Sequence, residues 1–435
     1  MRWKTTDYTG WGRALRATGR LARPERLSTL AGLMRDEPSP AIGNGRSYGD
    51  ACLNDGGAAI RTVRLDRVLS FDPATGTVEV ESGATLGDLA RLFAPRGWLP
   101  AVMPGTGFAT VGGAIAHDVH GKNHHGAGSF GQHLRALTLL LPGGETRRVT
   151  PGDPLFAATV GGLGQTGAIA TAELQLLKCK GDVMIVTERR IPGWDAFLER
   201  LDASDATYTV GWIDATARGD DLGRGILEEG ETGSGLVTQR GRARAVPFDA
   251  PAFALSPPVV KLFNAAYFRR VPAAGRTVVK PIQDFFFPLD RIRDWNRLYG
   301  REGFHQFQCV VPVDGAPALR AMLERIARSG LASPLAVLKR MGPGAAGLMS
   351  FPMEGYTLAV DFANRAGAQR LIAALEADAL AAGGRIYLAK DALSKGATIR
   401  AMYPRRAEWA EIVNGIDPEG RLETDLVRRL DLRSA

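Results

Sequence analysis

The chain has 435 residues and a mass of 46.5 kDa, enough for two or three domains with a sizeable buried core. Hydrophobic residues make up 45% and charged residues 23% of it, which excludes wholesale disorder, collagen and coiled coil. The net charge of +8 is spread along the chain without a nucleic-acid-binding module, so we expect no nucleic-acid partner. A modestly basic surface suits a phosphorylated substrate or an anionic membrane without requiring either.

Membrane spans, secretion signals and cysteine clusters are also absent from the sequence pattern. There is no run of eighteen apolar residues, and the basic N-terminus lacks the apolar core of a classical signal peptide. The cysteines, Cys52, Cys179 and Cys309, are odd in number and far apart, which fits neither a disulfide framework nor a metal cluster.

The first 178 residues combine glycine clusters with short apolar runs. Runs at 61–72, 77–83 and 135–144 place apolar residues between turn signals, as strands do. Residues 85–97 predict an amphipathic helix that stops at Gly97. Glycine clusters interrupt this region at 43–49, 105–113 and 161–167.

The remainder divides into an irregular stretch, an orderly stretch and a tail. The Gly-, Arg- and Glu-rich residues 218–245 predict a mobile loop. From 304 onward a ferredoxin-like β-α-β-β-α-β order is predicted, with elements at 305–313, 316–330, 334–342, 356–362, 367–384 and 385–390. The tail from about 385 is too short to fold alone, so we expect it to pack on the glycine-rich first domain. No internal repeat is recognisable.

Residues 41–54, AIGNGRSYGDACLN, indicate an anion-binding loop. Gly43, Gly45 and Gly49 let backbone amides approach an anion closely, and successive N–H groups in such a turn suit a diphosphate. Because no G-x-G-x-x-G continues into a helix, a dinucleotide-binding Rossmann site is poorly supported.

A second cluster, residues 104–131, holds eight glycines and four histidines. We expect its glycines to prevent a stable helix, and the nearest acid is Asp118, so we predict no metal site. The small residues Gly112, Gly113 and Ala114 indicate instead backbone packed against a flat or phosphorylated ligand. Two such loops in one domain indicate a site for a flat or phosphorylated ligand more specifically than either loop does alone.

These motifs carry a family resemblance. GNGRSYGD (43–50), the whole of 104–131 and TVGGLGQTG (159–167) resemble the PCMH-type FAD-binding domain of the vanillyl-alcohol-oxidase superfamily. In the C-terminal half, GFHQFQCVVP, LKRMGP, YTLAVDF, GGRIYLAKDA and AMYPR resemble the decaprenylphosphoryl-β-D-ribose 2′-oxidase family. The resemblance runs from about Gly10 to the end of the chain.

The resemblance implies an α+β fold in two parts. Residues 1–180 and 385–435 would form the FAD-binding domain, and 181–384 an α+β substrate cap that contains the ferredoxin-like element. FAD would lie in loops 41–51 and 105–113 and beside 117–120. The implied FAD contacts are Ala41, Ile42, Gly43, Asn44, Gly45, Arg46, Ser47, Tyr48, Gly49, Asp50, Ala51, Gly105, Thr106, Thr110, Val111, Gly112, Gly113, His117, Asp118, Val119, His120, Ile169 and Tyr387.

The resemblance also bears on how FAD is held. Superfamily members with covalent FAD often carry a histidine in the first loop, where this chain has Arg46. We therefore expect a non-covalent flavin, unless His117 or His120 is bonded to it.

The implied reaction oxidises the C2 hydroxyl of a polyprenyl-phosphoryl-β-D-ribofuranose to the 2-keto sugar, the first half of an epimerisation to the arabinose donor of cell-wall arabinan. A short-chain dehydrogenase partner would then reduce the keto sugar. Oxidising a secondary alcohol needs a hydride acceptor and a base. Lys390, one of only nine lysines and expected at a strand end, is the first candidate base, and His120 is the second.

The expected substrate contacts follow from the chemistry of a phosphorylated pentose. Lys122 and Lys339 would neutralise the phosphate. Ring stacking and amide hydrogen bonds suit the sugar, and the candidates are Tyr48, Trp212, Asn296, Gln306, Gln308 and Lys390. The apolar run 259–268, within the basic region 218–280, would allow peripheral membrane contact. The expected location is therefore cytoplasmic or peripheral to the inner membrane.

Two other functions remain open at this stage. An aldonolactone or alditol oxidase of the same superfamily would share the FAD domain, but the HWGK motif typical of the aldonolactone enzymes is absent from this sequence. A catalytically silent flavin- or sugar-binding protein is the second alternative. The joint presence of Lys390, His120 and the glycine loops argues against it.

Overall fold

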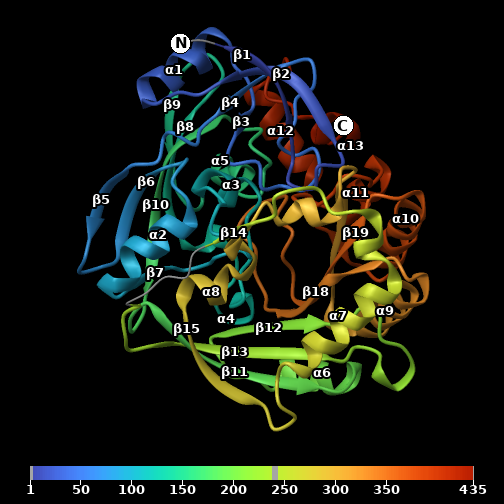
Figure 1. The fold of residues 1–435 in the computed structure, drawn as a ribbon. Helices are drawn as coiled ribbons and strands as arrows, with labels where there is room; N and C mark the ends of the chain where they lie inside the picture. The colour runs from blue at the N-terminus through green and yellow to red at the C-terminus, as the bar shows by residue number, and fades with distance from the viewer. Residues whose placement is uncertain (1–2, 238–242, 435) are drawn as a thin grey trace.

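Figure 1 shows the computed structural model, which describes residues 3–237 and 243–434. Helices and strands are mixed along the chain, so the predicted α+β class is confirmed. The N-terminal part holds two sheets, and a third, larger sheet forms the cap. The C-terminal helices lie beside the first sheet.

The first sheet has the order β1-β2-β4-β3 and the second the order β5-β6-β10-β8-β9, with β7 also paired to β10. The strands are β1 (Lys4–Thr9), β2 (Arg16–Ala22), β3 (Ala41–Ile42), β4 (Ala58–Arg61), β5 (Val68–Asp72), β6 (Thr77–Glu81), β7 (Trp98–Pro100), β8 (Leu134–Leu140), β9 (Thr146–Val149) and β10 (Ala168–Lys178). Around them lie α1 (Leu27–Asp36), α2 (Leu86–Phe93), α3 (Val111–Ala116), α4 (His124–Ala127) and α5 (Pro154–Thr159).

Helix α2 illustrates how the sequence sets these elements. Thr85 caps its N-terminus, because the Thr85 hydroxyl accepts a hydrogen bond from the Asp88 N–H at 3.2 Å. Leu86, Leu89 and Phe93 bury one face, as the predicted periodicity requires. After a 3₁₀ turn the chain leaves the helix at Gly97, whose φ of 82° favours glycine.

The cap is one eight-stranded antiparallel sheet of order β15-β11-β13-β12-β18-β19-β17-β20. Its C-terminal half is the predicted ferredoxin-like unit: β17 (Phe304–Val311), α9 (Ala316–Ser329), β18 (Ala332–Met341), β19 (Gly355–Ala363), α10 (Ala366–Ala381) and β20 (Arg385–Ile386). Its N-terminal half repeats that plan with β11 (Val183–Ile191), α6 (Trp194–Asp202), β12 (Tyr208–Ile213), β13 (Gly225–Gly233), α7 (Pro257–Arg269) and β15 (Arg276–Pro281). The short elements β14 (Arg244–Ala245), α8 (Ile282–Phe286) and β16 (Ile292–Arg293) complete it.

The two halves of the cap are therefore related folds without a recognisable sequence repeat. In each half the four strands follow the spatial order fourth-first-third-second. The second strands, β12 and β18, join the halves through the pairs Gly211–Leu338 and Trp212–Val337. One continuous sheet face results.

The predicted loop over 218–245 is wrong for its central part. Residues 225–233 form β13, an interior strand, because Ile226 and Leu227 are buried. Gly225 and Gly230 leave room for aromatic rings against the strand, since a Cβ at Gly230 would lie 2.7 Å from the Phe285 ring. Residues 238–242 of the predicted loop lie outside the described residues.

Two further local predictions need correction. The expected strand over 385–390 ends at Ile386, and the chain then turns, with the Lys390 N–H donating to the Tyr387 carbonyl at 2.8 Å. The 104–131 cluster does contain a helix, α3, because its buried Val111 and Ile115 compensate for its glycines. Thr110 caps α3 by accepting from the Gly113 N–H at 3.2 Å.

The C-terminal segment adds α11 (Gly396–Met402), α12 (Arg406–Ile416) and α13 (Asp425–Leu430). It lies beside the first sheet (Figure 1). The Asp425 N–H donates to the carbonyl of Leu53, in the connection between β3 and β4, at 2.9 Å. The Arg429 guanidinium bridges Asp50 at 2.7 Å and Asp391 at 2.8 Å. The tail thereby connects the first glycine loop to the turn that carries Lys390.

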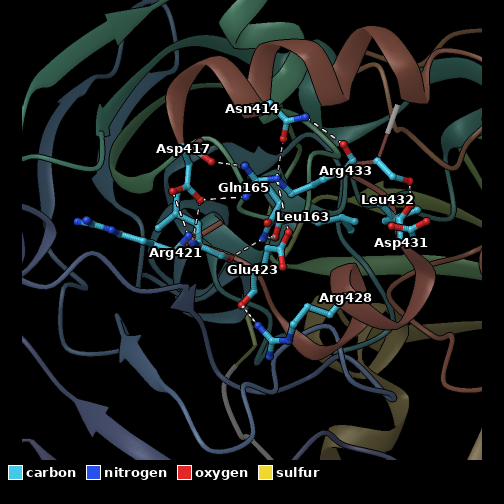
Figure 2. Close-up of polar contacts among 12 residues, drawn as sticks. Leu163, Gln165, Asn414, Asp417, Arg421, Glu423, Arg428, Asp431, Leu432 and Arg433 are labelled. Atoms are coloured by element: carbon cyan, nitrogen blue, oxygen red, sulfur yellow. Dashed lines mark hydrogen bonds and ion pairs between the residues drawn. The ribbon is translucent and has the colours of Figure 1, made fainter. Parts of the chain in front are cut away.

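Figure 2 shows a buried polar network at the end of the chain. The Asp417 carboxylate accepts from the Leu422 N–H at 2.9 Å and from the Arg433 guanidinium at 3.0 Å, and both side chains are buried. Gln165, in the third glycine cluster, donates to the Leu422 carbonyl at 2.8 Å. The network therefore fixes the 161–167 loop through the C-terminal segment.

We expect Arg433→Met to destabilise the protein by about 3–5 kcal/mol, because the substitution leaves the Asp417 carboxylate buried without its cation. Urea unfolding followed by tryptophan fluorescence measures the effect. Arg421→Met is the matched control, since Arg421 forms an exposed ion pair with Glu419 and its loss should change stability by less than about 1 kcal/mol. Equal effects of the two substitutions would contradict this account.

Candidate active site

A cavity of about 910 Å³ lies between the glycine loops of the first part and one face of the cap sheet. It is large enough for a cofactor with part of a substrate. The predicted cofactor residues along its wall are Ala41, Ile42, Gly43, Asn44, Gly45, Arg46, Ser47, Tyr48, Ala51, Gly105, Thr106, Thr110, Gly112, Gly113, His117, Val119, His120, Ile169 and Tyr387. The predicted substrate residues there are Tyr48, Lys122, Trp212, Gln306, Gln308, Lys339 and Lys390.

Gly49, Asp50, Val111, Asp118 and Asn296 lie outside this lining. Val111 belongs to the apolar core, and Asp50 pairs with Arg429. Gly49 packs directly on the turn that carries Lys390, since a Cβ there would lie 1.7 Å from the Asp391 carbonyl oxygen.

Asp118 and Asn296 connect loops beside the cavity to other segments of the chain. The buried Asp118 carboxylate accepts hydrogen bonds from the Gly131 N–H at 2.8 Å, the Ala346 N–H at 3.2 Å and the Ser350 hydroxyl. The Asn296 amide donates to the Trp11 carbonyl at 3.0 Å. Their partners are protein groups that shape the site.

The end of the cavity between the first two glycine clusters fits FAD. A Cβ at Gly43 would lie 2.3 Å from the Thr110 Oγ1, so only glycine allows this close approach of the two loops. Within residues 3–237 and 243–434, four buried polar atoms of cavity-lining residues have no hydrogen-bond partner: Arg46 Nε, Ser82 Oγ and His117 Nδ1 beside the glycine loops, and Arg270 Nε on the cap. Unpartnered polar atoms beside closely approaching backbone suit a flat, diphosphate-bearing ligand.

Arg46 is held in a fixed position on this wall. Its guanidinium lies between the Trp11 ring at 4.1 Å and the Phe108 ring at 4.6 Å, and burial lowers its pKa. Asp290 of the cap accepts from the Thr106 hydroxyl at 2.8 Å and from the Gly107 N–H at 2.7 Å. These two hydrogen bonds connect the cap to the second glycine loop.

The cap contributes to the cavity through the period-two alternation of its strands. Gln306 and Gln308 project from β17, and Thr357 and Ala359 from β19. The register pairs Gln308 with Ala359, and Lys339 on β18 with Thr357, so these side chains lie in two neighbouring rows on one face of the sheet. The segments after α3 and after β20 bring His120 and Lys390 to this face.

His120 is buried with both ring nitrogens engaged. Its Nε2 lies 3.0 Å from the Gln308 side-chain amide and its Nδ1 lies 3.0 Å from the Lys339 Nζ. Burial, followed by the Lys339 charge, lowers the His120 pKa well below its usual value, so the imidazole is neutral at pH 7. Burial also lowers the Lys339 pKa to about 7.

Lys390 has a different environment. Its Nζ lies 3.5 Å from the centroid of the Tyr48 ring, and burial lowers its pKa. At the outer part of the cavity the Lys122 Nζ lies 4.0 Å from the Phe285 ring, and burial lowers its pKa to about 8. A lysine that is neutral near pH 7 can accept a proton, so the site holds a usable base.

Sequence reasoning missed several residues of the site. The cavity is also lined by Arg270, Lys280 and Glu228. These residues precede residue 304, in the part of the chain that the sequence pattern describes as irregular. Asp361 and Tyr299 lie behind Gln306, where the Tyr299 hydroxyl donates to Asp361 at 3.0 Å. The alternation through Thr357 and Ala359 was the signal that places Asp361 on the cavity face of β19.

The described ranges contain no group of three or more His, Cys, Asp or Glu side chains arranged to hold a metal ion. In the same part of the chain no helix has both the length and the apolar character of a membrane span.

Comparison with known proteins agrees with this site. Residues 22–150 match the FAD binding domain family. The decaprenylphosphoryl-beta-D-ribose oxidase of Mycolicibacterium smegmatis is 36% identical over 98% of both chains. The L-gulono-1,4-lactone dehydrogenase of Mycobacterium tuberculosis is 32% identical over 39% of this chain and 40% of its own.

The full-length match reaches the glycine loops, the cap strand that supplies Lys339 and the C-terminal segment that supplies Lys390, whereas the lactone dehydrogenase match covers less than half of either protein. The cofactor is FAD. This chain belongs to the decaprenylphosphoryl-beta-D-ribose oxidase family and is an FAD-dependent oxidoreductase.

Proposed function

We propose that the protein oxidises the C2 hydroxyl of a polyprenyl-phosphoryl-β-D-ribofuranose to the 2-keto sugar, the first half of an epimerisation. The observation that supports this most strongly is one cavity in which the glycine cradle faces Lys390, Gln306 and Gln308. The M. smegmatis relative, whose name states the same sugar lipid, matches the chain over both sides of that cavity.

The reaction removes a hydride from C2 and a proton from its hydroxyl, and the O–H electron pair becomes the second bond of the carbonyl. FAD, when bound, accepts the hydride. Lys390 accepts the proton, because burial lowers its pKa to about 7 and so leaves part of the amine unprotonated at neutral pH; its Nζ lies 3.5 Å from the centroid of the Tyr48 ring. We assign His120 a positioning role, because Gln308 and Lys339 occupy both of its ring nitrogens.

The remaining cavity groups suit the two ends of the substrate. Lys122, Lys339, Arg270 and Lys280 line the cavity and supply cations for a phosphate, although Arg270 and Lys280 are also paired with Glu188 and Glu228. Gln306 and Gln308 offer amide hydrogen bonds to the pentose, and Tyr48 and Trp212 offer ring faces. Trp212 is oriented by its indole N–H, which donates to the Pro334 carbonyl at 2.8 Å.

Anaerobic bleaching of the flavin tests this function. Purified protein is mixed with a short polyprenyl-phosphoryl ribose, an aldonolactone or an alditol, and absorbance near 450 nm is followed. We expect bleaching by the phosphoryl ribose alone. Lys390→Met should retain flavin but lower the rate of bleaching at least a hundredfold, since general-base catalysis contributes roughly 10²–10⁴-fold.

Lys395→Met is the matched control, because Lys395 is an exposed lysine five residues along the chain. It should bleach at the wild-type rate. Bleaching by the lactone or alditol alone would instead favour the alternative oxidase function. A wild-type rate for Lys390→Met would remove Lys390 from the mechanism.

We also propose that FAD is held without a covalent bond, since the first loop carries Arg46 rather than histidine. Acid precipitation should then release the yellow flavin into the supernatant. Gly43→Ala should lower the flavin content of the purified protein several-fold, because the new Cβ would displace Thr110 from its capping position. Gly415→Ala is the control, as its Cβ would meet no atom within 4 Å. Yellow colour in the acid pellet would overturn the proposal.

A reductase of the short-chain dehydrogenase class is the partner we propose for the keto product, because an epimerisation needs the carbonyl reduced again. Membrane contact is the other proposed interaction. Helix α7 exposes Leu262 (75%) and Phe263 (49%) beside Lys261, and its other end carries Tyr267, which lines the cavity. A lipid-linked substrate would thus enter beside an apolar, cationic surface.

Flotation with anionic phospholipid vesicles tests the membrane contact. The wild type should float, and the double variant Leu262→Ser/Phe263→Ser should float several-fold less, because it loses the exposed apolar area. Leu69→Ser, which changes an exposed leucine on β5, should float like the wild type. Absence of wild-type flotation, or equal loss in the control, would count against this surface.

A further inference from the structure

Asp361 is a fully buried carboxylate that the mechanism above does not use. It lies on β19 on the same face as Thr357 and Ala359, opposite Gln306 in the register. The Gln306 amide and the Tyr299 hydroxyl, the latter at 3.0 Å, both donate to its oxygens. Burial raises the Asp361 pKa to about 7, and the two donors lower it from a still higher value, so part of the carboxyl group is ionised at neutral pH.

A continuous stack of rings connects Asp361 to Lys390. The Tyr299 ring stacks on Phe304 at 4.1 Å, and the edge of Phe304 meets Tyr48 at 5.2 Å. The Lys390 Nζ also lies over Tyr48, 3.5 Å from the ring centroid. Asp361 and Lys390 therefore belong to one packed wall of the cavity.

The other titratable groups of this wall are bases, neutral side chains, or acids that have partners of their own. Burial raises the pKa values of Tyr48 and Tyr299, so both remain neutral, while His117 and His120 are neutral because burial lowers theirs. Asp391, next to Lys390, is paired with Arg429. Arg46 and Lys339 are bases, and the Asp290 carboxylate accepts hydrogen bonds from Thr106 and Gly107.

The charge balance of the pair favours proton uptake. Without a counter-charge, Lys390 would pass from 0 to +1 in a buried position, which is unfavourable. With an ionised Asp361, the pair passes from −1 to 0 as Lys390 takes the hydroxyl proton. Asp361 raises the Lys390 pKa against the lowering effect of burial, so it keeps Lys390 a strong enough base.

We propose that Asp361 is a positioning residue for the oxidation, whose carboxylate holds Gln306 toward the sugar and compensates the charge that Lys390 gains with the substrate proton. Only the expected effect of Asp361 on the oxidation rests on the proposed function. The electrostatic link between Asp361 and Lys390 stands on the contacts of the wall and can be measured without substrate.

The first experiment compares wild type with Asp361→Asn, both as FAD-loaded proteins. The pH dependence of Lys390 modification by trinitrobenzenesulfonate, read by peptide mass spectrometry, reports its protonation. Loss of the carboxylate should move the midpoint to lower pH by on the order of one unit. In anaerobic flavin bleaching the acidic limb should move the same way, and the limiting rate should fall roughly tenfold because the base is weaker.

Two further variants separate charge from packing. Tyr299→Phe removes one donor but keeps the carboxylate, so it should move the labelling midpoint in the same direction by a smaller amount, because Asp361 is then less readily ionised. Ser333→Ala is the control. Ser333 also contacts the Tyr299 hydroxyl, at 2.9 Å, but not Asp361, and its loss should leave the midpoint unchanged.

An unmoved midpoint in Asp361→Asn would overturn the inference, as would an equal shift in Ser333→Ala. If Asp361→Asn does not fold, an unmoved midpoint in Tyr299→Phe overturns it instead. The proposed function fails separately, when phosphoryl ribose does not bleach the wild-type flavin, and the labelling result still decides the electrostatic link.

Discussion

The site depends on placing amino groups away from bulk water without pairing each one to an acid. Lys122, Lys339 and Lys390 all face one cavity, and burial lowers the pKa of each. Desolvation of this kind destabilises the charged form, so the fold must supply the free energy that holds these side chains in place. The outcome is a set of amines that can take up a proton or meet an anion.

Direct backbone contact between the first glycine loop and the turn that carries Lys390 supplies part of the free energy that holds Lys390 in place. The Tyr48 N–H donates to the Ala389 carbonyl at 2.9 Å, and Gly49 leaves no space for a side chain against Asp391. Arg429 then joins Asp50 to Asp391. The Lys390 amine lies over the Tyr48 ring because these backbones are fixed, and α13 is essential to the geometry although it lies outside the cavity.

The parts of this arrangement that sequence could predict are those encoded locally. The α2 helix and the ferredoxin-like order from 304 follow from periodicity and turn residues, and the glycine cradle follows from close-approach chemistry. Strand β13 escaped prediction because glutamates and glycines dominate it, and its pairing on both edges overrides that composition. Asp361 escaped because its role depends on Tyr299, which is 62 residues away in sequence and contacts it only after folding.

The duplicated plan of the cap explains how one cavity serves two chemical tasks. Joining β12 to β18 aligns the cavity-facing side chains of both halves on one sheet. The N-terminal half contributes Trp212, Glu228 and Lys280, whereas the C-terminal half contributes Gln306, Gln308 and Lys339. One face can meet both ends of a phosphorylated sugar, because Lys339, proposed for the phosphate, lies on β18 and Lys390, the proposed base, follows β20. The shared sheet fixes the spacing of its side chains, since a strand cannot slip by one residue without turning its inward side chains outward.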